Sequence, residues 1–303
     1  MRALAGFIMA GRLRAMLVAA TGAMLALLAP PVTSPLSYLG GATVALVTLR
    51  RGATEGAIVL VGAALGTGAL AALALGQAAP VVLGTLLLWV PAWIVAQVLR
   101  RTVSLAWALK AAVAIGLAVV LGVYLVHGDP APWWHQVLQP MVDSAVKRSG
   151  LKGDPAQILA EASRLMTGVA AAALVLGLLV CLLLARWWQA MLYNPGGFRE
   201  EFHGLRVDRT SGWASVGVLL TAELARGTLA AVAAQLAVVL MVMYLLAGLA
   251  LVHALVTRLR AHAGWLVGMY LALLILPAQA GVLLAAAGLL DGWLNFRARL
   301  PAP

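Results

Sequence analysis

Six stretches of this chain are long and apolar enough to cross a lipid bilayer as helices, and this feature constrains the fold most strongly. The hydrocarbon core of a bilayer requires about 20 apolar residues in a helix, with a range of about 17–25. A helix also satisfies its own backbone hydrogen bonds where water is absent. The predicted spans are Gly56–Ala79, Val81–Leu99, Val103–Val126, Met166–Ala185, Leu229–Val256 and Trp265–Leu290.

Two shorter apolar runs, Ala15–Ala29 and Pro35–Leu49, are separated by Pro30 and Pro31. Each would form a helix of about 22 Å, so it needs extension, a thinner bilayer or a re-entrant path. The arginines ahead of the first run imitate a signal peptide, but no small-residue cleavage pattern follows the run. We therefore expect an uncleaved first span and eight spans in total.

The composition excludes most soluble classes of protein. The chain is 63% hydrophobic and 10% charged, against about 45–50% and about 25% in soluble domains. Its single cysteine, Cys181, lies in an apolar run and has no partner in the chain for a disulfide. We expect an all-α polytopic helix bundle, with residues 1–303 forming one integral membrane domain in contact with lipid.

Basic residues at the ends of the runs predict the orientation. They fall on alternate sides of successive spans, which gathers them on one face, and the positive-inside rule makes that face cytoplasmic. The prediction is a bacterial inner-membrane protein with a cytoplasmic N-terminus. The net charge of +11 thus indicates orientation instead of nucleic-acid binding. The gathered residues are Arg2, Arg12, Arg14, Arg50, Arg51, Arg100, Arg101, Arg186, Arg199, Arg206 and Arg209.

The stretch 213–221 is apolar but short, and Glu223 and Arg226 follow it. If it lies in the interface there are eight spans, and if it crosses there are nine. Eight is preferred because charged residues are expensive in hydrocarbon. Both alternatives place two arginine pairs on opposite faces of the membrane: Arg258 with Arg260, and Arg297 with Arg299.

Residues 127–165 predict an amphipathic helical hairpin on the outer face. Its first helix begins near Trp133 and carries an apolar face at helical spacing. Its second helix begins at Asp154, which can cap it, with Pro155 first in the helix and Gln157 in capping-box register. We expect the hairpin to pack on the bundle, the alternative being a lid or a docking surface. The predicted apolar face is Val137, Met141 and Ala145, with Leu138 and Val142 beside them.

Residues 186–212 form the predicted cytoplasmic loop. Trp187 and Trp188 stand where an aromatic belt is expected. The sequence from Asn194 to Gly197 predicts a tight turn before an interfacial helix. The alternative is a loop that docks a partner protein, and its candidate residues are Tyr193, Asn194, Pro195, Gly196, Gly197, Phe198 and Arg199.

Recognisable catalytic patterns are missing from the sequence. The five histidines form no zinc-protease pair, and no nucleophile elbow occurs. We predict neither an enzyme nor a metal or cofactor site. Lys110, Glu223 and Arg226 are candidates for a solute or charge-pair site, since charges within spans are functional by default. The alternatives are snorkelling for Lys110 and an interfacial pair between the other two. Asp291 is expected at a helix end.

Gly62 and Gly66 form a small face that lets another helix approach closely. Packing within the bundle is favoured over homo-oligomer formation, which stays as the alternative. Pro91 and Pro277 are the kind of interruption found in the broken helices of transporters.

Three segments carry a resemblance to a known family. They are 193–203 (YNPGGFREEFH), 248–253 (GLALVH) and 289–297 (LLDGWLNFR), and the segment 28–41 fits as well. With these, the chain resembles the YybS-like family of bacterial multi-pass inner-membrane proteins. It is more distantly similar to the substrate-binding subunits of energy-coupling-factor vitamin transporters and to the rod-shape protein MreD. The segment 127–165 departs from the compact six-span core of both.

Two functional hypotheses follow. The first is a transporter-like protein that binds a small solute within its helices; because the sequence has no ATP-binding motif, it would rely on a partner ATPase or an ion gradient. The second is a non-transporting scaffold of the cell envelope or division machinery, which would act through the segments 127–165 and 186–212.

Overall fold

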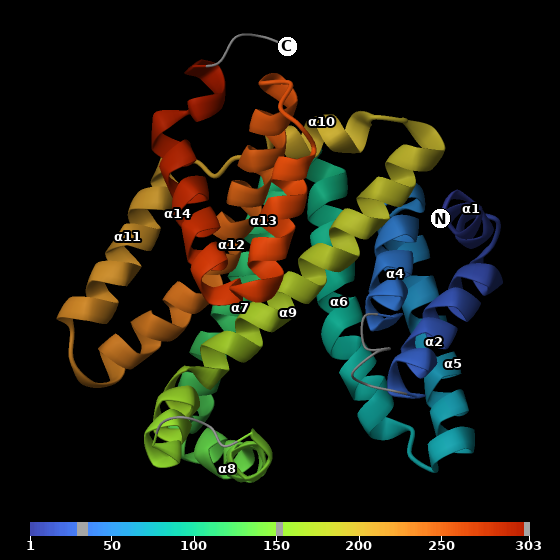
Figure 1. Cartoon of the computed structure of the whole chain (residues 1–303). Helices are drawn as coiled ribbons and strands as arrows, with labels where there is room; N and C mark the ends of the chain where they lie inside the picture. Colours follow the sequence, from blue (N-terminus) through green and yellow to red (C-terminus); the bar gives the residue numbers. More distant parts are fainter. Residues whose placement is uncertain (29–35, 150–153, 300–303) are drawn as a thin grey trace. The chain divides into compact units, whose positions relative to one another are not determined.

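The computed structural model describes residues 1–28, 36–149 and 154–299 (Figure 1). Over these residues it contains thirteen α-helices and one short 3-10 helix. The sequence predicts one membrane domain, and the structure distinguishes two compact units within the chain. Unit 1 comprises Met1–Ala112 and Leu176–Leu205, and unit 2 comprises Val113–Val175 and Arg206–Pro303.

Five helices are long and apolar enough to cross a membrane, so the fold is that of a helical membrane protein. They match five of the six long predicted spans to within a turn or two, except that the fourth is much longer. The predicted total of eight spans is not confirmed. The five helices are α5 (Ala53–Leu75), α6 (Ala79–Thr102), α7 (Leu105–His127), α9 (Pro155–Tyr193) and α12 (Gly227–Arg258).

Unit 1 is built around α4 (Ser37–Arg51), in which every residue from Gly40 to Leu49 is buried. Small residues on all sides of α4 let α2 (Arg12–Leu28), α5 and α6 pack against it. Its two buried threonines donate their hydroxyls to carbonyls one turn earlier, Thr43 to Leu39 and Thr48 to Val44. These bonds satisfy the hydroxyls inside an apolar core.

Several further predictions concern the other helices of unit 1. The face of Gly62 and Gly66 lies against Met16 and Ala20 of α2 in the same chain, so it packs within the bundle, which was the favoured interpretation. Pro91 lies inside α6 without ending it. The predicted proline break at Pro30, Pro31 and Pro35 lies outside the described residues. The remaining helices of unit 1 are α1 (Arg2–Met9) and α10 (Gly197–Gly204).

In unit 2, α12 packs against α11 (Arg209–Leu224) and α14 (Pro277–Leu294). The hydroxyl of Tyr244 on α12 lies 2.8 Å from the Ser215 hydroxyl and donates to the Ser211 carbonyl of α11 at 3.0 Å. Gly248 on α12 and Gly288 on α14 let these two helices approach backbone to backbone. Figure 1 shows α14 beside α12 and α13.

The predicted span Trp265–Leu290 is wrong as a single helix. It is divided into α13 (Gly264–Ile275) and α14 at Leu276, whose backbone is not helical (φ −128°, ψ 61°). The cause is Pro277, because a residue before proline is disfavoured in the α conformation. At about 1.5 Å per residue, α13 is about 18 Å long, too short to cross a bilayer core.

The two ends of the α13–α14 hairpin lie at the same end of unit 2. Arg258, at the end of α12, donates to the carbonyl of Arg297 just beyond α14, at 2.6 Å. Both predicted topologies placed these residues on opposite faces of the membrane, and the contact contradicts both. The physical reason is the turn at Pro277, which sends the chain back before it crosses.

The stretch predicted to be either interfacial or spanning is the helix α11. Arg209 at its start donates to the Trp293 carbonyl at 3.1 Å. The N-terminus of α11 therefore lies beside the C-terminus of α14. From there α11 runs away from this arginine end, and α12 returns to it. We call this end the arginine end of unit 2; it contains Arg206, Arg209, Arg258, Arg260, Arg297 and Arg299.

The segment 127–165 is only partly as predicted. Its first helix is α8 (Ala131–Ser149), tied to α9 by a 2.8 Å bond from Trp134 Nε1 to Thr167 Oγ1. Of the predicted face, Val137 and Met141 are exposed, whereas Leu138, Val142 and Ala145 are half-buried. The half-buried side carries Trp134, Leu138, Val142 and Ala145.

The second predicted helix of this segment is the beginning of α9. Asp154 caps it by accepting from the Ala156 amide at 3.0 Å, as predicted. Gln157 donates to Glu161 at 2.8 Å, a contact different from the predicted capping box. No break follows, because apolar residues continue from the amphipathic stretch into the span, and α9 runs unbroken for 39 residues. The residues between α8 and Asp154, 150–153, lie outside the described residues.

Candidate functional site

The structure does not gather the three predicted charged residues into one site. Lys110 lies in unit 1, in the second turn of α7, with Nζ 4.7 Å from the centre of the Trp107 ring. Glu223 and Arg226 are exposed in unit 2 and flank the connection from α11 to α12. They do not share one helical face, because Ala225 and Arg226 have extended backbones.

The predicted tight turn after α9 is confirmed. The helix ends at Tyr193, and Gly196 has φ +94°, a conformation that favours glycine. The short helix α10 follows. Trp188 is fully buried, so only Trp187 is available for the predicted aromatic belt. The Arg50 guanidinium lies 4.3 Å from the centre of the Tyr193 ring.

Unit 2 contains a cavity of about 800 Å³ at the end away from its arginine end. It is surrounded by the C-terminal ends of α7 and α11 and by the N-terminal parts of α9 and α12. Small residues form one wall: Ala222, Gly227, Ala230, Ala231 and Ala234. The polar and charged lining is Tyr124, Asp129, Glu161, Arg164 and Thr228.

Two of the charged lining groups already have contacts and one does not. Asp129 accepts from the Ala131 amide at 3.0 Å, and Glu161 accepts from Gln157. In the part of the chain that the structure describes, the Arg164 guanidinium makes neither a hydrogen bond nor an ion pair. The cavity thus presents a guanidinium with unused donors between carboxylates that keep further acceptor capacity.

Next to this cavity, Gln235 of α12 forms hydrogen bonds with α9 and α7. It is 1% exposed, and its amide nitrogen donates to the Arg164 carbonyl at 2.7 Å and lies 3.2 Å from the Tyr124 hydroxyl. Its amide oxygen accepts from the Gly168 amide. The Gly168 amide and the Arg164 carbonyl are four residues apart on α9, which is the spacing of a hydrogen bond within a regular α-helix. The side chain therefore clamps α12 to the backbone of α9.

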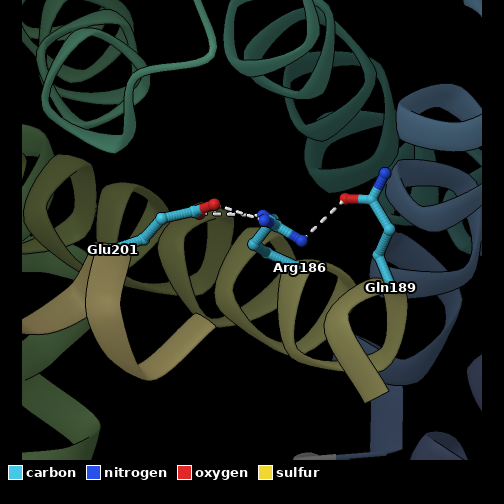
Figure 2. Close-up of polar contacts among 3 residues, drawn as sticks. All are labelled: Arg186, Gln189 and Glu201. Atoms are coloured by element: carbon cyan, nitrogen blue, oxygen red, sulfur yellow. Dashed lines mark hydrogen bonds and ion pairs between the residues drawn. The ribbon is translucent and has the colours of Figure 1, made fainter. Parts of the chain in front are cut away.

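Unit 1 contains a smaller pocket of about 260 Å³, which we call the Arg186 pocket. The closing turns of α4, α6 and α9 surround it together with α10. Arg186 donates through Nε, at 2.8 Å, and Nη2 to the Glu201 carboxylate, and through Nη1 to Gln189 Oε1 at 3.2 Å (Figure 2). The lining residues are Leu49, Leu99, Arg100, Val103, Arg186, Gln189, Tyr193, Asn194 and Glu201.

A third polar cluster lies at the C-terminal end of α14, at the arginine end of unit 2. Asp291 lies in the last turn, as predicted, and accepts from the Phe296 amide at 3.0 Å. Its other oxygen is 3.5 Å from Arg297 Nε. Burial lowers the pKa of the Arg297 guanidinium; Asp291 opposes this shift, and the nearby Arg206 and Arg258 add to it.

The sequence analysis missed the residues that line the Arg186 pocket on α6, α9 and α10, except Tyr193 and Asn194. Arg100 and Arg186 were interpreted only as markers of orientation. Gln235 had a detectable signal, since it is an amide well inside an apolar run, where polar residues are rare. The contact between Arg186 and Glu201, 15 residues apart on the consecutive helices α9 and α10, leaves no comparable local pattern.

Among the described residues, no group of three or more His, Cys, Asp or Glu side chains could hold a metal ion. Comparison of the chain with models of protein families, with curated proteins and with solved structures gives no match. The resemblance to the YybS-like family therefore stays a prediction.

Proposed function

We propose that the chain is a transporter-like protein of the bacterial inner membrane that binds a small polar solute in the cavity of unit 2. The observation that supports this most directly is the size and lining of the cavity. Sites for small molecules are concave, of about 300–1,000 Å³, with apolar walls and a few placed polar groups. A volume of about 800 Å³, a wall of small residues and the Arg164 guanidinium fit this description.

The lining selects the class of solute. Arg164 is placed to bind a carboxylate or phosphate, and Asp129 and Glu161 attract a cationic group. A zwitterion such as an amino acid is the solute that uses both signs of charge. The positive-inside rule makes the arginine end of unit 2 cytoplasmic, so the cavity opens outward. Energy for transport would come from a partner ATPase or an ion gradient.

Ligand-induced thermal stabilisation of the purified full chain tests the proposal. A panel of amino acids, amines, vitamins and nucleobases should contain a compound that raises the unfolding temperature, with a stabilisation of about 2.7 kcal/mol at a hundred times its Kd. Ala231→Leu, which fills the cavity, and Arg164→Gln should both abolish the shift. Ala286→Leu, an equal enlargement at an exposed position of α14, should preserve it. A shift that survives in Ala231→Leu would place the ligand elsewhere.

Cysteine labelling tests the proposed orientation. The native Cys181 is fully buried and gives a low background. Cysteines at Ser211, Ala261 and Ala298 should react from the cytoplasmic side, whereas one at Ser144 should react from outside. Opposite labelling of Ala261 and Ala298 would contradict the α13–α14 hairpin.

The exposed face of α8 favours a second candidate, the envelope scaffold. Trp133 is 57% exposed and Met141 65% exposed, so this apolar surface is covered by lipid or by a partner. A scaffold should be recovered from mild detergent with a stoichiometric partner. Replacing Trp133 and Met141 by serine should release that partner, and recovery of the wild-type chain alone would count against this candidate.

A further inference from the structure

We propose that the Arg186 pocket of unit 1 binds a phosphate group, carried by an anionic phospholipid or free in solution. This site is separate from the cavity of unit 2, and the proposal does not rest on the proposed function. Its first support is the charge of the lining, which contains two arginines, Arg100 and Arg186, and one carboxylate, Glu201. Arg50 lies close by, stacked on the lining residue Tyr193.

The second support is that the remaining hydrogen-bonding capacity of the pocket is mostly donor capacity. Glu201 receives two N–H groups of Arg186, which compensates its charge. Gln189 turns its amide oxygen to Arg186, and Figure 2 shows its amide nitrogen directed away from that contact. No hydrogen bond of this NH₂ group is found among the described residues. Gln189 is half-buried, so this NH₂ group is available to a ligand that accepts hydrogen bonds.

Arg100 is held in place with donors to spare. Its Nη1 donates to the carbonyls of Leu49 and Thr48 at 3.1 and 3.3 Å, at the close of α4. This contact offsets the negative partial charge of that helix end, which would otherwise repel an anion. Its Nε and Nη2 groups make no hydrogen bond within the described part of the chain. Guanidinium groups bind phosphate oxygens through two parallel hydrogen bonds, and Nε with Nη2 form such a fork.

The rim of the pocket favours a lipid as the carrier of the phosphate. Val103 lines the pocket and is 81% exposed, whereas the lining residues Leu49 and Leu99 are buried. An exposed apolar residue next to a basic pocket, at the end of the membrane helix α6, suits a headgroup whose acyl chains continue along that helix. Basic pockets between membrane helices on the cytoplasmic side bind anionic headgroups in this way.

The test is a titration of the detergent-purified full chain with phosphatidylglycerol, phosphatidylcholine or inorganic phosphate at constant ionic strength, followed by thermal unfolding. Phosphatidylglycerol should stabilise the wild type more than phosphatidylcholine does. Gln189→Met and Arg100→Gln should each weaken its apparent affinity about tenfold, the effect of one charge-assisted hydrogen bond. Arg101→Gln is the matched control, because it removes the same charge next to the pocket without altering the lining.

Each outcome decides the proposal. If inorganic phosphate reproduces the stabilisation with the same dependence on Gln189 and Arg100, the pocket binds a phosphate group free in solution. If only phosphatidylglycerol does so, the ligand is the lipid headgroup. Equal affinities in wild type, Gln189→Met and Arg101→Gln would overturn it, and so would equal effects of the two lipids together with no effect of inorganic phosphate. Gln189→Met keeps all charges and Arg100 contacts, so it remains informative if Arg100→Gln does not fold.

Discussion

The helix pairs α2–α5 in unit 1 and α12–α14 in unit 2 both meet at glycines, but the atoms that meet there differ. In unit 1, a Cβ added to Gly62 would meet the thioether of Met16, and one added to Gly66 would meet the Ala20 methyl at 3.7 Å. In unit 2, a Cβ on Gly248 would meet the backbone of Leu284, and one on Gly288 would meet the backbone of Tyr244. A side chain can rotate away from a new methyl group, whereas a helix backbone cannot.

This difference teaches that a small-residue pattern does not by itself identify the tightest helix contact. The spacing of Gly62 and Gly66 in one helix is the recognisable signal, yet the atoms opposite that face belong to side chains. Gly248 and Gly288 lie on separate helices, so no spacing in the sequence connects them. The helix pair α12–α14 should therefore respond more strongly to added methyl groups than the pair α2–α5.

The largest expected effect is that of Gly248→Ala or Gly288→Ala. Either methyl group forces α12 and α14 apart, and overpacking of this kind costs about 1–3 kcal/mol or more. We expect values near the upper end of that range, because the obstructing atoms are backbone. Thermal or denaturant unfolding of the purified chain in detergent measures it. Stability equal to that of the wild type would show that these helices are not in backbone contact.

The next effect concerns the other backbone contact of α12, through Gln235. Gln235→Leu keeps the volume but removes three hydrogen bonds to Tyr124, Arg164 and Gly168. We expect a loss of about 1–2 kcal/mol, since polar contacts between membrane helices measure about 0.6 kcal/mol on average and at most about 1.7. Hydrogen exchange at Gly168 should increase in the same variant. Unchanged protection there would mean that the amide does not clamp α9.

The predictability of the fold shows the same division between local and distant contacts. The spans of α5, α6, α7 and α12 follow from apolar runs, because burial in lipid acts on every residue of a helix. The Asp154 cap and the turn at Gly196 follow from local backbone chemistry. The α13–α14 hairpin was missed although Pro277 was noted, because the sequence does not show whether a proline bends a helix, as Pro91 is tolerated in α6, or ends it.

The candidate sites were harder to predict than the spans. The sequence pointed to Lys110, Glu223 and Arg226 because charge in an apolar run is visible without knowing the fold. The two cavities instead depend on which helix ends meet: Arg164 with Thr228 in unit 2, Arg100 with Gln189 in unit 1. Each of these residues has an ordinary local explanation, as a helix-end cation or an interfacial polar group, so only the packing distinguishes them.

A smaller loss is expected for Gly62→Ala. The new methyl group would lie 2.5 Å from Met16 Cε and 2.6 Å from Sδ, so the thioether has to move. Methionine has three rotatable side-chain bonds and adapts easily, which should limit the net loss to about 1 kcal/mol. Gly62→Ala combined with Met16→Ala separates the two contributions in the same unfolding assay. If the added methyl group costs as much in the Met16→Ala background as in the wild type, backbone and not the thioether is in the way.

The smallest effect, and the only gain, is expected for Gly66→Ala in the same helix. Its methyl group would meet Ala20 at 3.7 Å, an ordinary van der Waals contact, so it adds packing without displacing an atom. Alanine is also favoured over glycine within a helix by up to about 1 kcal/mol. The unfolding temperature should equal or exceed that of the wild type. Because Gly66→Ala and Gly248→Ala add the same methyl group to apolar helices, their opposite signs would locate the difference in what each methyl group meets. A loss in Gly66→Ala comparable to that in Gly248→Ala would remove the distinction between the two units.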